Sequence, residues 1–284
     1  MLEPPRRPQR LSVALPASFT RDIPHLREKT GRVGIIARAL AIFRVDEVVV
    51  YNDGKDRISK QEGRLFEKLL VYQETPQYMR RELFTRDPDL QFAGTLPPLR
   101  LPSHPGIETP RIGLVREASV IETGASSVVN AGFKSPMRVA SRLKLHERVT
   151  VRLTRTEPHL QGELVDASRL PIYWSFRVTN TDSTLGGLIR KERRDLTIST
   201  SRSGRTIREA MQDVSVRWRS SQRPIVLFGS PDQGVPQILR SGGFDVGEEC
   251  DFNLNTIPDQ GVETVRTEEA LIATLSVLNL LGES

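Results

Sequence analysis

The hydrophobic positions in the first third of the chain alternate between strand-like and helix-like spacing. Apolar side chains repeat every second residue in 11–15, which predicts a strand, and 45–53 is a β-branched run closed by turn residues. Helical spacing in 31–43 and 58–74, and a Thr-Pro start signal in 75–83, predict three helices. A strand, a helix and a second strand in close succession predict a βαβ unit and a parallel sheet.

The pattern changes near residue 93. A proline-rich stretch leads into four or five short β-rich runs at roughly ten-residue spacing, with no helix-period segment between them. Helix and strand alternate again after residue 165, and the last predicted helix covers 267–281. The chain therefore predicts an α/β domain in two parts, 1–94 and 166–284, around an inserted β-barrel at 95–165.

Charge is distributed unevenly over the 284 residues. Residues 1–223 hold 39 Lys and Arg against 25 Asp and Glu, whereas residues 224–284 hold 2 against 10. A basic body favours a polyanionic partner such as nucleic acid, because each neutralised phosphate releases counterions. Arginines scattered over solvated faces would give the same totals, so charge alone leaves both interpretations open.

Targeting and redox signals are few. The single cysteine fits a reducing compartment, because the chain cannot form an internal disulfide. Residues 1–10 lack the apolar stretch of a signal peptide, and the near-apolar run 271–281 is about half as long as a membrane span. We expect a soluble, cytoplasmic protein.

Several kinds of chemistry are disfavoured. The sequence has no P-loop and no G-x-G-x-x-G after its first strand, which argues against a P-loop NTPase and weakens a dinucleotide site. The four histidines stand far from one another and from Cys250, so no metal site is expected. Cys250 lies between Glu249 and Asp251, whose carboxylates should raise the pKa of its thiol, so we expect packing and not nucleophilic catalysis.

Three strand-to-loop transitions carry the candidate chemistry: LTISTSRSG, IVLFGSPDQG and LNTIPDQGVET. Each places small, polar and glycine residues directly after an apolar strand, at the carboxyl ends where open α/β sheets bind ligands. Glycine also lets backbone groups approach a flat heterocycle closely. Three ordinary surface turns are the alternative, although the last segment is unusually rich in polar groups for a turn.

The same segments carry a family resemblance. NTIPDQGVETVRTEEALIATLSVLN, LFGSP and DLTISTS resemble the C-terminal knot of the SPOUT methyltransferases. LSVALPAS, ARALAIFRVDEVVVYND, ETPQYMRRELF and DLQFAGTLPPL are similar to an archaeal and eukaryotic branch of that superfamily, described as RNA uridine-N3 methyltransferases. The resemblance covers nearly the whole chain. It implies a mostly parallel α/β sheet, a C-terminal trefoil knot, a rare exception among folds, and an OB-fold-like insert.

The resemblance also implies a cofactor, S-adenosylmethionine, bound in the knot and held largely by backbone groups. By position in the matching motifs, the cofactor-binding residues would be Thr200, Ser201, Gly229, Ser230, Asn255, Thr256, Ile257, Gln260, Gly261 and Thr264. Ser230-Pro231 replaces a second glycine that family members commonly show, so the hydrogen bonding of that loop is open. The cofactor sites of the family lie against a subunit interface, which implies a homodimer.

Methyl transfer from a sulfonium needs alignment and a poised nucleophile. If the target is N3 of uridine, its proton must leave, so a base accepts it or a cation stabilises the anion. The candidates are Arg266, Glu263 and Arg10, with Gln260, Glu269 and Arg21 as further positions. Arg266 could equally be a structural ion-pair partner, Glu269 a helix-start acid, and the two N-terminal arginines solvated side chains.

The insert is expected to face RNA. It has seven cations between residues 134 and 155 and one acid, Glu147. The predicted RNA-binding residues are Lys134, Arg138, Arg142, Lys144, Arg148 and Arg152, with Arg155 beside them and Phe133 available for stacking. Some of these side chains would be ordinary barrel exterior.

The resulting hypothesis is an S-adenosylmethionine-dependent methyltransferase that acts on a base of rRNA or tRNA, with uridine N3 implied by the resemblance alone. Two alternatives stay open: a non-catalytic RNA-binding or ribosome-assembly protein that keeps the knotted scaffold, and a methyltransferase acting on protein.

Overall fold

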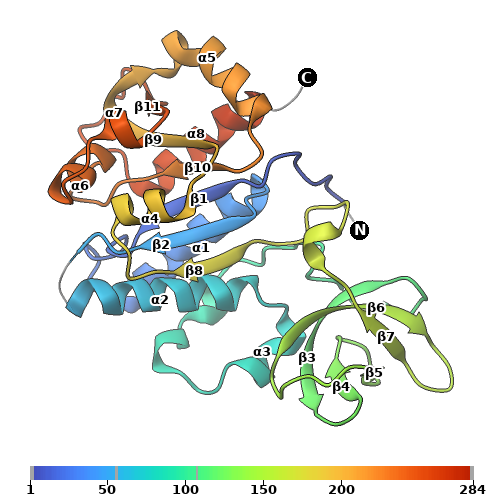
Figure 1. The fold of residues 1–284 in the computed structure, drawn as a ribbon. Coiled ribbons are helices and arrows are strands. Elements are labelled where there is room, and N and C mark those ends of the chain that lie inside the picture. The colour runs from blue at the N-terminus through green and yellow to red at the C-terminus, as the bar shows by residue number, and fades with distance from the viewer. Residues whose placement is uncertain (1–2, 55–56, 107, 282–284) are drawn as a thin grey trace. The chain divides into compact units, whose positions relative to one another are not determined.

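The structure is a computed structural model that describes residues 3–54, 57–106 and 108–281. The chain forms two compact units. The sheet unit comprises Arg7–Val71, Phe92–Pro97 and Phe176–Ser284, and the barrel unit comprises Met1–Arg6, Tyr72–Gln91 and Pro98–Ser175 (Figure 1). The barrel unit therefore extends beyond residues 95–165 on both sides, and it includes a helix that precedes the barrel strands.

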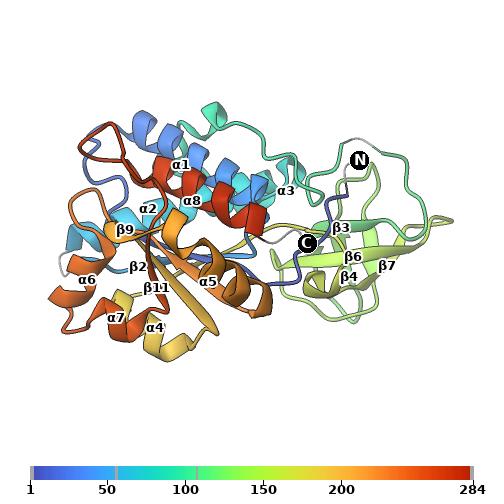
Figure 2. The ribbon, with the colours of Figure 1, turned by 90° about the horizontal axis from the view of Figure 1, so that it is seen from above.

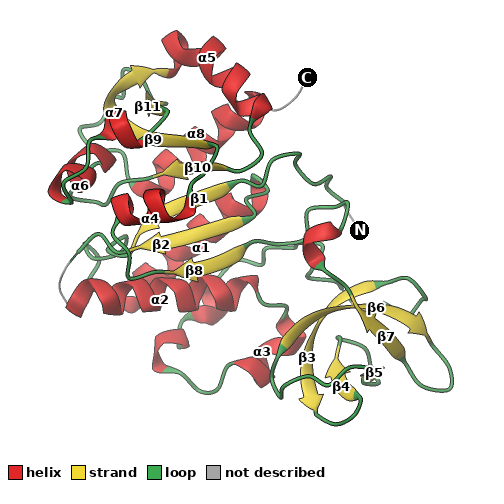
Figure 3. Cartoon of the chain, viewed as in Figure 1, coloured by secondary structure: helices red, strands yellow, loops and turns green. Residues whose placement is uncertain are grey.

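Six parallel strands form the core of the sheet unit, in the order β11-β9-β10-β1-β2-β8 (Figure 3). This confirms the predicted α/β architecture with a parallel sheet. The strands are β1 (Ser12–Pro16), β2 (Glu47–Tyr51), β8 (Arg177–Asn180), β9 (Leu196–Thr206), β10 (Pro224–Leu227) and β11 (Phe252–Asn255).

Helices cover both faces of this sheet. α1 and α8 lie side by side on one face, and α4, α6 and α7 lie on the other (Figure 2). The helices are α1 (Leu26–Ile42), α2 (Arg57–Glu74), α4 (Leu185–Glu192), α5 (Ile207–Ser220), α6 (Val235–Ser241), α7 (Val246–Glu249) and α8 (Thr267–Leu281), with a 3-10 turn η2 (Ala93–Thr95).

The central strand β1 accounts for the layered core. All five of its residues are buried between β2 and β10. Successive side chains point to opposite faces of a strand. Ala14 joins the core under α4 and α6, with Leu188 and Leu239, and its neighbours Val13 and Leu15 are buried on the face of α1.

The observed elements differ from the predicted ones mainly at their ends. α1 begins five residues before the predicted start at 31. α5 continues to Ser220, whereas the sequence predicts a helix only near 206–214. α6 and α7 were not predicted, and β11 lies in a stretch that reads as irregular in the sequence. These three are only four to seven residues long, which is too short for hydrophobic periodicity to show.

The barrel unit contains a closed five-stranded barrel in the order β3-β4-β5-β7-β6, which confirms the inserted barrel. Only the β5–β7 pairing is parallel. The elements of the barrel unit are α3 (Gln77–Leu83), η1 (Pro88–Leu90), β3 (Val115–Glu122), β4 (Ser127–Asn130), β5 (Met137–Val139), β6 (Arg148–Arg155), β7 (Gln161–Leu164) and η3 (Ala167–Arg169). Val120, Met137 and Leu153 are among the fully buried side chains of its core.

A buried ionic network fixes the barrel to the residues before it. Nη2 of Arg148 donates to Glu74 at 2.7 Å, and its Nε donates to Glu117 at 2.6 Å. The indole of Trp174 donates to Glu117 at 2.6 Å, and His104 Nε2 lies 2.5 Å from the Glu74 carbonyl. Each buried carboxylate therefore has a cation and further donors, as a charge in a protein interior requires.

Candidate functional site

The candidate site begins at a bulge in β9. Ser199 pairs with Asn253 of β11, but the next pair along the ladder is Arg205 with Leu254. The residues in between, 200–204, therefore leave the regular ladder and turn outward. A methyl group at Gly204 would come within 2.6 Å of the Asn253 carbonyl oxygen, so only glycine allows the bulge to return this close to β11.

The second wall of the site is the turn that follows β10. The Ser230 N–H donates to the Gln233 carbonyl at 2.8 Å, and the Gln233 N–H donates to the Ser230 hydroxyl at 3.1 Å. A side chain at Gly229 would meet the Gln233 carbonyl oxygen at 2.5 Å. The turn is therefore closed by Ser230 itself, and its tightness depends on glycine at 229.

The third wall is the loop between β11 and α8. The Asn255 amide accepts from the Ile257 N–H at 3.0 Å and donates to the Arg202 carbonyl at 3.0 Å. The Gln260 amide donates to the Val262 and Glu263 carbonyls at 2.7 and 3.1 Å. The Asn255 amide thus holds this loop against the β9 bulge, and the Gln260 amide holds the loop's own backbone in place.

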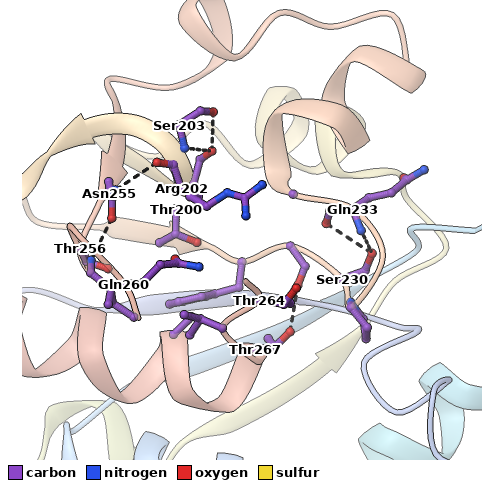
Figure 4. A pocket seen from close by; sticks show the side chains of 18 of the residues that line it. Thr200, Arg202, Ser203, Ser230, Gln233, Asn255, Thr256, Gln260, Thr264 and Thr267 are labelled. Carbon is purple, nitrogen blue, oxygen red and sulfur yellow. Dashed lines mark hydrogen bonds between the residues drawn. The ribbon is translucent and has the colours of Figure 1, made fainter. Parts of the chain in front are cut away.

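The three segments enclose a cavity of about 400 Å³ at the carboxyl ends of β9, β10 and β11. Figure 4 shows polar side chains from all three segments converging on it. Thr200 donates to the Leu227 carbonyl at 2.9 Å, and Thr267 donates to the Gly229 carbonyl at 3.2 Å. These bonds tie the walls of the cavity together.

The structure brings together nine of the ten residues predicted to bind the cofactor. The exception is Gly261, which does not line the cavity and whose Cα faces open space. The nine lining residues are Thr200, Ser201, Gly229, Ser230, Asn255, Thr256, Ile257, Gln260 and Thr264.

The three predicted catalytic residues lie in different places. Glu263 lines the cavity, and its carbonyl accepts from Arg202 at 2.8 Å. Arg266 is exposed and does not line the cavity, and its N–H donates to the Glu269 carboxylate at 2.9 Å, so Glu269 acts as a helix-start acid. Arg10 precedes β1, where its N–H donates to the Gln222 carbonyl, at the amino ends of the parallel strands and thus at the end of the sheet opposite to the cavity.

Sequence reasoning missed Arg202 and Thr267 as lining residues. As the first residue of the predicted last helix, Thr267 is typical of a helix cap, whereas in the structure its hydroxyl bonds to the Gly229 carbonyl across the cavity wall. Arg202 could not be recognised from the sequence, because in a regular strand it would lie beyond the end of the sheet and away from the cavity. No residue spacing in the sequence predicts the bulge. The one local signal is Gly204, two residues after Arg202.

Cys250 does not line the cavity. Burial, together with the carboxylates of Asp251 and Glu249, raises the pKa of the Cys250 thiol to about 12 against a weaker opposing hydrogen bond to Ser199. Cys250 is therefore a packed thiol, as expected from its neighbours. In the part of the chain that the structure describes, no group of three His, Cys, Asp or Glu side chains could hold a metal ion. None of the described helices is long and apolar enough to span a bilayer.

The predicted RNA-binding residues of the barrel fall into three groups. Arg148 belongs to the buried network with Glu74 and Glu117, so its guanidinium is not available to an external ligand. Arg152 forms an ion pair with Glu163 at 3.2 Å on the barrel surface. The remaining cations are exposed and make no ion pair with any described residue: Lys134, Arg138, Arg142, Lys144 and, beside them, Arg155.

The structure is that of an α/β protein whose parallel sheet carries a polar cavity at the carboxyl ends of three strands. A five-stranded barrel is inserted in its chain. The "Putative RNA methyltransferase" family matches residues 10–278. The chain therefore belongs to this family.

Individual relatives agree with the family match. The chain is 35% identical to an uncharacterised protein of Haloarcula marismortui, over 95% of this chain and 98% of that protein. It is 31% identical to proteins of Mus musculus and Homo sapiens named 28S rRNA (uridine-N(3))-methyltransferase. Those two matches cover 96% of this chain and 76% and 78% of the relatives.

Proposed function

We propose that this protein transfers a methyl group from S-adenosylmethionine to N3 of a uridine in large-subunit ribosomal RNA. The observation that carries the proposal is the cavity of about 400 Å³ at the loops after β9, β10 and β11, in a chain of the RNA methyltransferase family. The names of the mouse and human relatives supply the nucleotide and the RNA.

The lining of the cavity fits S-adenosylmethionine better than a phosphorylated nucleotide. Arg202 is the one Lys or Arg among the lining residues, and it is accompanied by Asp232 and Glu263. A polyphosphate would require several cations or a glycine-rich anion cradle. Hydroxyl, amide and backbone groups suit an adenosine, and the carboxylates of Asp232 and Glu263 suit the ammonium group of the amino-acid tail. When bound, the cofactor supplies an electrophilic methyl group.

In this proposal the protein's own residues mainly position the reactants. Asn255 and Gln260 hold the loop after β11 in one conformation, and Gly229 and Ser230 keep the opposing turn compact. Fixed walls can place the methyl carbon in line with the attacking nitrogen, and such alignment accounts for a large share of catalysis in bimolecular transfers. Family resemblance extends the proposal to a trefoil knot formed by the segment that carries these loops.

The barrel unit would then bind RNA. Five exposed cations without ion-pair partners among the described residues lie within 22 residues of the barrel sequence. A closed five-stranded barrel is also the architecture of the OB-fold, which binds oligonucleotides. Neutralisation of phosphates by these side chains would give the complex a strong salt dependence.

A homodimer is the expected assembly. The adjacent helices α1 and α8 expose large apolar side chains, including Ile42 at 58% and Leu280 at 73% exposure. Exposed apolar patches of this kind often mark interfaces between subunits. Sedimentation velocity of the purified chain tests the assembly directly, because a monomer at micromolar concentration would contradict it.

Cofactor binding is tested by titration calorimetry with S-adenosylmethionine. The wild-type protein is expected to bind, and Gly229→Ala is expected to weaken binding at least about tenfold, because a methyl group 2.5 Å from the Gln233 carbonyl oxygen forces the turn to move. Gly94→Ala is the matched control, since its methyl group would meet no atom within 4 Å. A well-folded wild-type protein that does not bind S-adenosylmethionine would contradict the proposal.

A further inference from the structure

Arg202 occupies a position in the cavity that neither the sequence motifs nor the family relationship assigns. It lies in the β9 bulge, and its guanidinium points into the cavity (Figure 4). Its carbonyl accepts from the Asn255 amide at 3.0 Å, and its Nη1 donates to the Glu263 carbonyl at 2.8 Å. The residue is therefore held at both ends, by the same loop that closes the cavity.

Most of the hydrogen-bonding capacity of this guanidinium is unused. A guanidinium carries five N–H donors in a rigid plane and is permanently charged. In Arg202 a single side-chain bond, to the Glu263 carbonyl, is formed with the described residues. The remaining N–H groups are oriented by that bond and by the bulge, but they are free to bind another molecule that enters the cavity.

The chemistry of uridine N3 calls for a positive charge at the reacting base. The N3–H bond must break before N3 can accept a methyl group, and the negative charge that results is shared by N3 and the two carbonyl oxygens of uracil. Positioned cationic donors stabilise such a charge as it develops. The other charged residues that line the cavity, Asp232 and Glu263, are carboxylates, which would repel it.

Building on the function proposed above, we propose that Arg202 is a catalytic residue that binds a uracil carbonyl oxygen and stabilises the anion formed when N3 loses its proton. The proton goes to solvent water. The N3 lone pair then forms the bond to the methyl carbon while the bond from that carbon to sulfur breaks, and the electron pair of the broken bond remains on sulfur as a neutral thioether. The backbone carbonyl of Glu263 accepts from the Arg202 guanidinium, so Glu263 is a positioning residue.

The test compares Arg202→Gln with Arg205→Gln. Arg205 lies three residues further along β9, outside the cavity, and forms an exposed ion pair with Asp213 at 2.7 Å. In single-turnover reactions on an unmodified large-subunit rRNA transcript, Arg202→Gln is expected to lower the rate about 100- to 1,000-fold. Arg205→Gln is expected to leave it unchanged. Affinity for S-adenosylmethionine, from calorimetry, should be unaltered in both variants.

Two further measurements separate charge stabilisation from a merely structural role. The rate deficit of Arg202→Gln should shrink as the pH rises, because solvent then removes the N3 proton more readily. It should also shrink on a transcript that contains 5-fluorouridine, whose N3–H is more acidic. A deficit that is equal on both transcripts and at every pH would overturn the assignment, as would a wild-type rate in Arg202→Gln.

Loss of S-adenosylmethionine binding in Arg202→Gln would also overturn the assignment, in favour of a role in closing the loop. These outcomes are distinct from failure of the proposed function. That function fails when the wild-type protein neither binds S-adenosylmethionine nor methylates the transcript.

Discussion

Single residues carry much of the specific geometry of this protein, and His104 in the barrel unit shows how burial alters their chemistry. Its Nε2 lies 2.5 Å from the Glu74 carbonyl. Burial, with smaller contributions from the charges of Arg80 and Arg148, lowers the pKa of His104 to about 4, against the opposing hydrogen bond to Glu74. His104 is thus neutral and structural at neutral pH.

This pKa makes the stability of the barrel unit depend on pH. The unfolded chain binds a proton at His104 near pH 6.5, whereas the folded chain resists it down to about pH 4, so the contribution of the neutral histidine is complete above pH 6.5 and declines as the pH falls through this window. Between these values the free energy of unfolding should fall by up to about 3 kcal/mol more in the wild type than in His104→Gln.

Chemical denaturation of both proteins at several pH values measures this difference, and His159→Gln, which changes an exposed histidine of the same unit, is the control. Parallel pH profiles for the wild type and His104→Gln would contradict the account.

At the scale of single residues, contiguous sequence motifs indicate which residues gather in the structure. Nine of the predicted cofactor-binding residues line one cavity because the loops after parallel strands meet at one edge of a sheet. Arg202 was not predictable, since its direction depends on a bulge whose register is set by the pairing of β9 with β11. Gly261, the tenth of the predicted residues, follows Gln260 in the sequence but does not line the cavity.

At the scale of elements, the cations of the barrel show why a run of charged residues cannot be interpreted from the sequence alone. Arg148, at the start of β6, points into the buried network, whereas Arg138 of β5 and Arg142 after it are exposed. The first supports the fold and the other two can bind phosphate. Which side of a short strand faces inward depends on how the barrel closes, and residues far away in sequence supply the carboxylates.

This division between buried and exposed arginines predicts that substitutions will affect either stability or RNA binding, but not both. Arg148→Met should lower the free energy of unfolding by about 3–5 kcal/mol, because it leaves Glu74 and Glu117 buried without their cation. The double variant Arg138→Gln, Arg142→Gln should keep wild-type stability and reduce the salt dependence of RNA binding by about two counterions. Thermal unfolding and RNA affinity across a salt series measure both effects.

The division would be refuted by a stable Arg148→Met protein that binds RNA poorly, or by a double variant whose RNA binding and salt dependence match those of the wild type.

Elements with a continuous or periodic apolar pattern are predictable from the sequence, and elements without one are not. α8 coincides with the predicted helix, and β1, β2, β9 and β10 correspond to predicted strands, because their apolar residues are continuous or alternate. β11, α6 and α7 depend on tertiary packing instead. Asn255, at the end of β11, shows the consequence, since the site was recognised there by motif and not by secondary structure.

At the scale of the whole molecule, the uneven charge of the chain acquires a functional meaning. The C-terminal segment 224–284, with 2 basic and 10 acidic residues, supplies two of the three loops around the cavity, whereas the barrel supplies exposed cations. In the proposed function, polyanionic RNA would therefore be attracted by other parts of the chain than the loops around the cavity. A fold alone does not establish an activity, so the account depends on chemistry at the cavity.

The most direct test of this account is nucleoside mass spectrometry after reaction of the purified protein with S-adenosylmethionine and unmodified large-subunit rRNA. We predict close to one 3-methyluridine per rRNA molecule with the wild type and Gly94→Ala, and a strong reduction with Gly229→Ala. A protein that binds both S-adenosylmethionine and this RNA but forms no 3-methyluridine would contradict the central claim, and absence of every methylated nucleoside would favour a non-catalytic role in ribosome assembly.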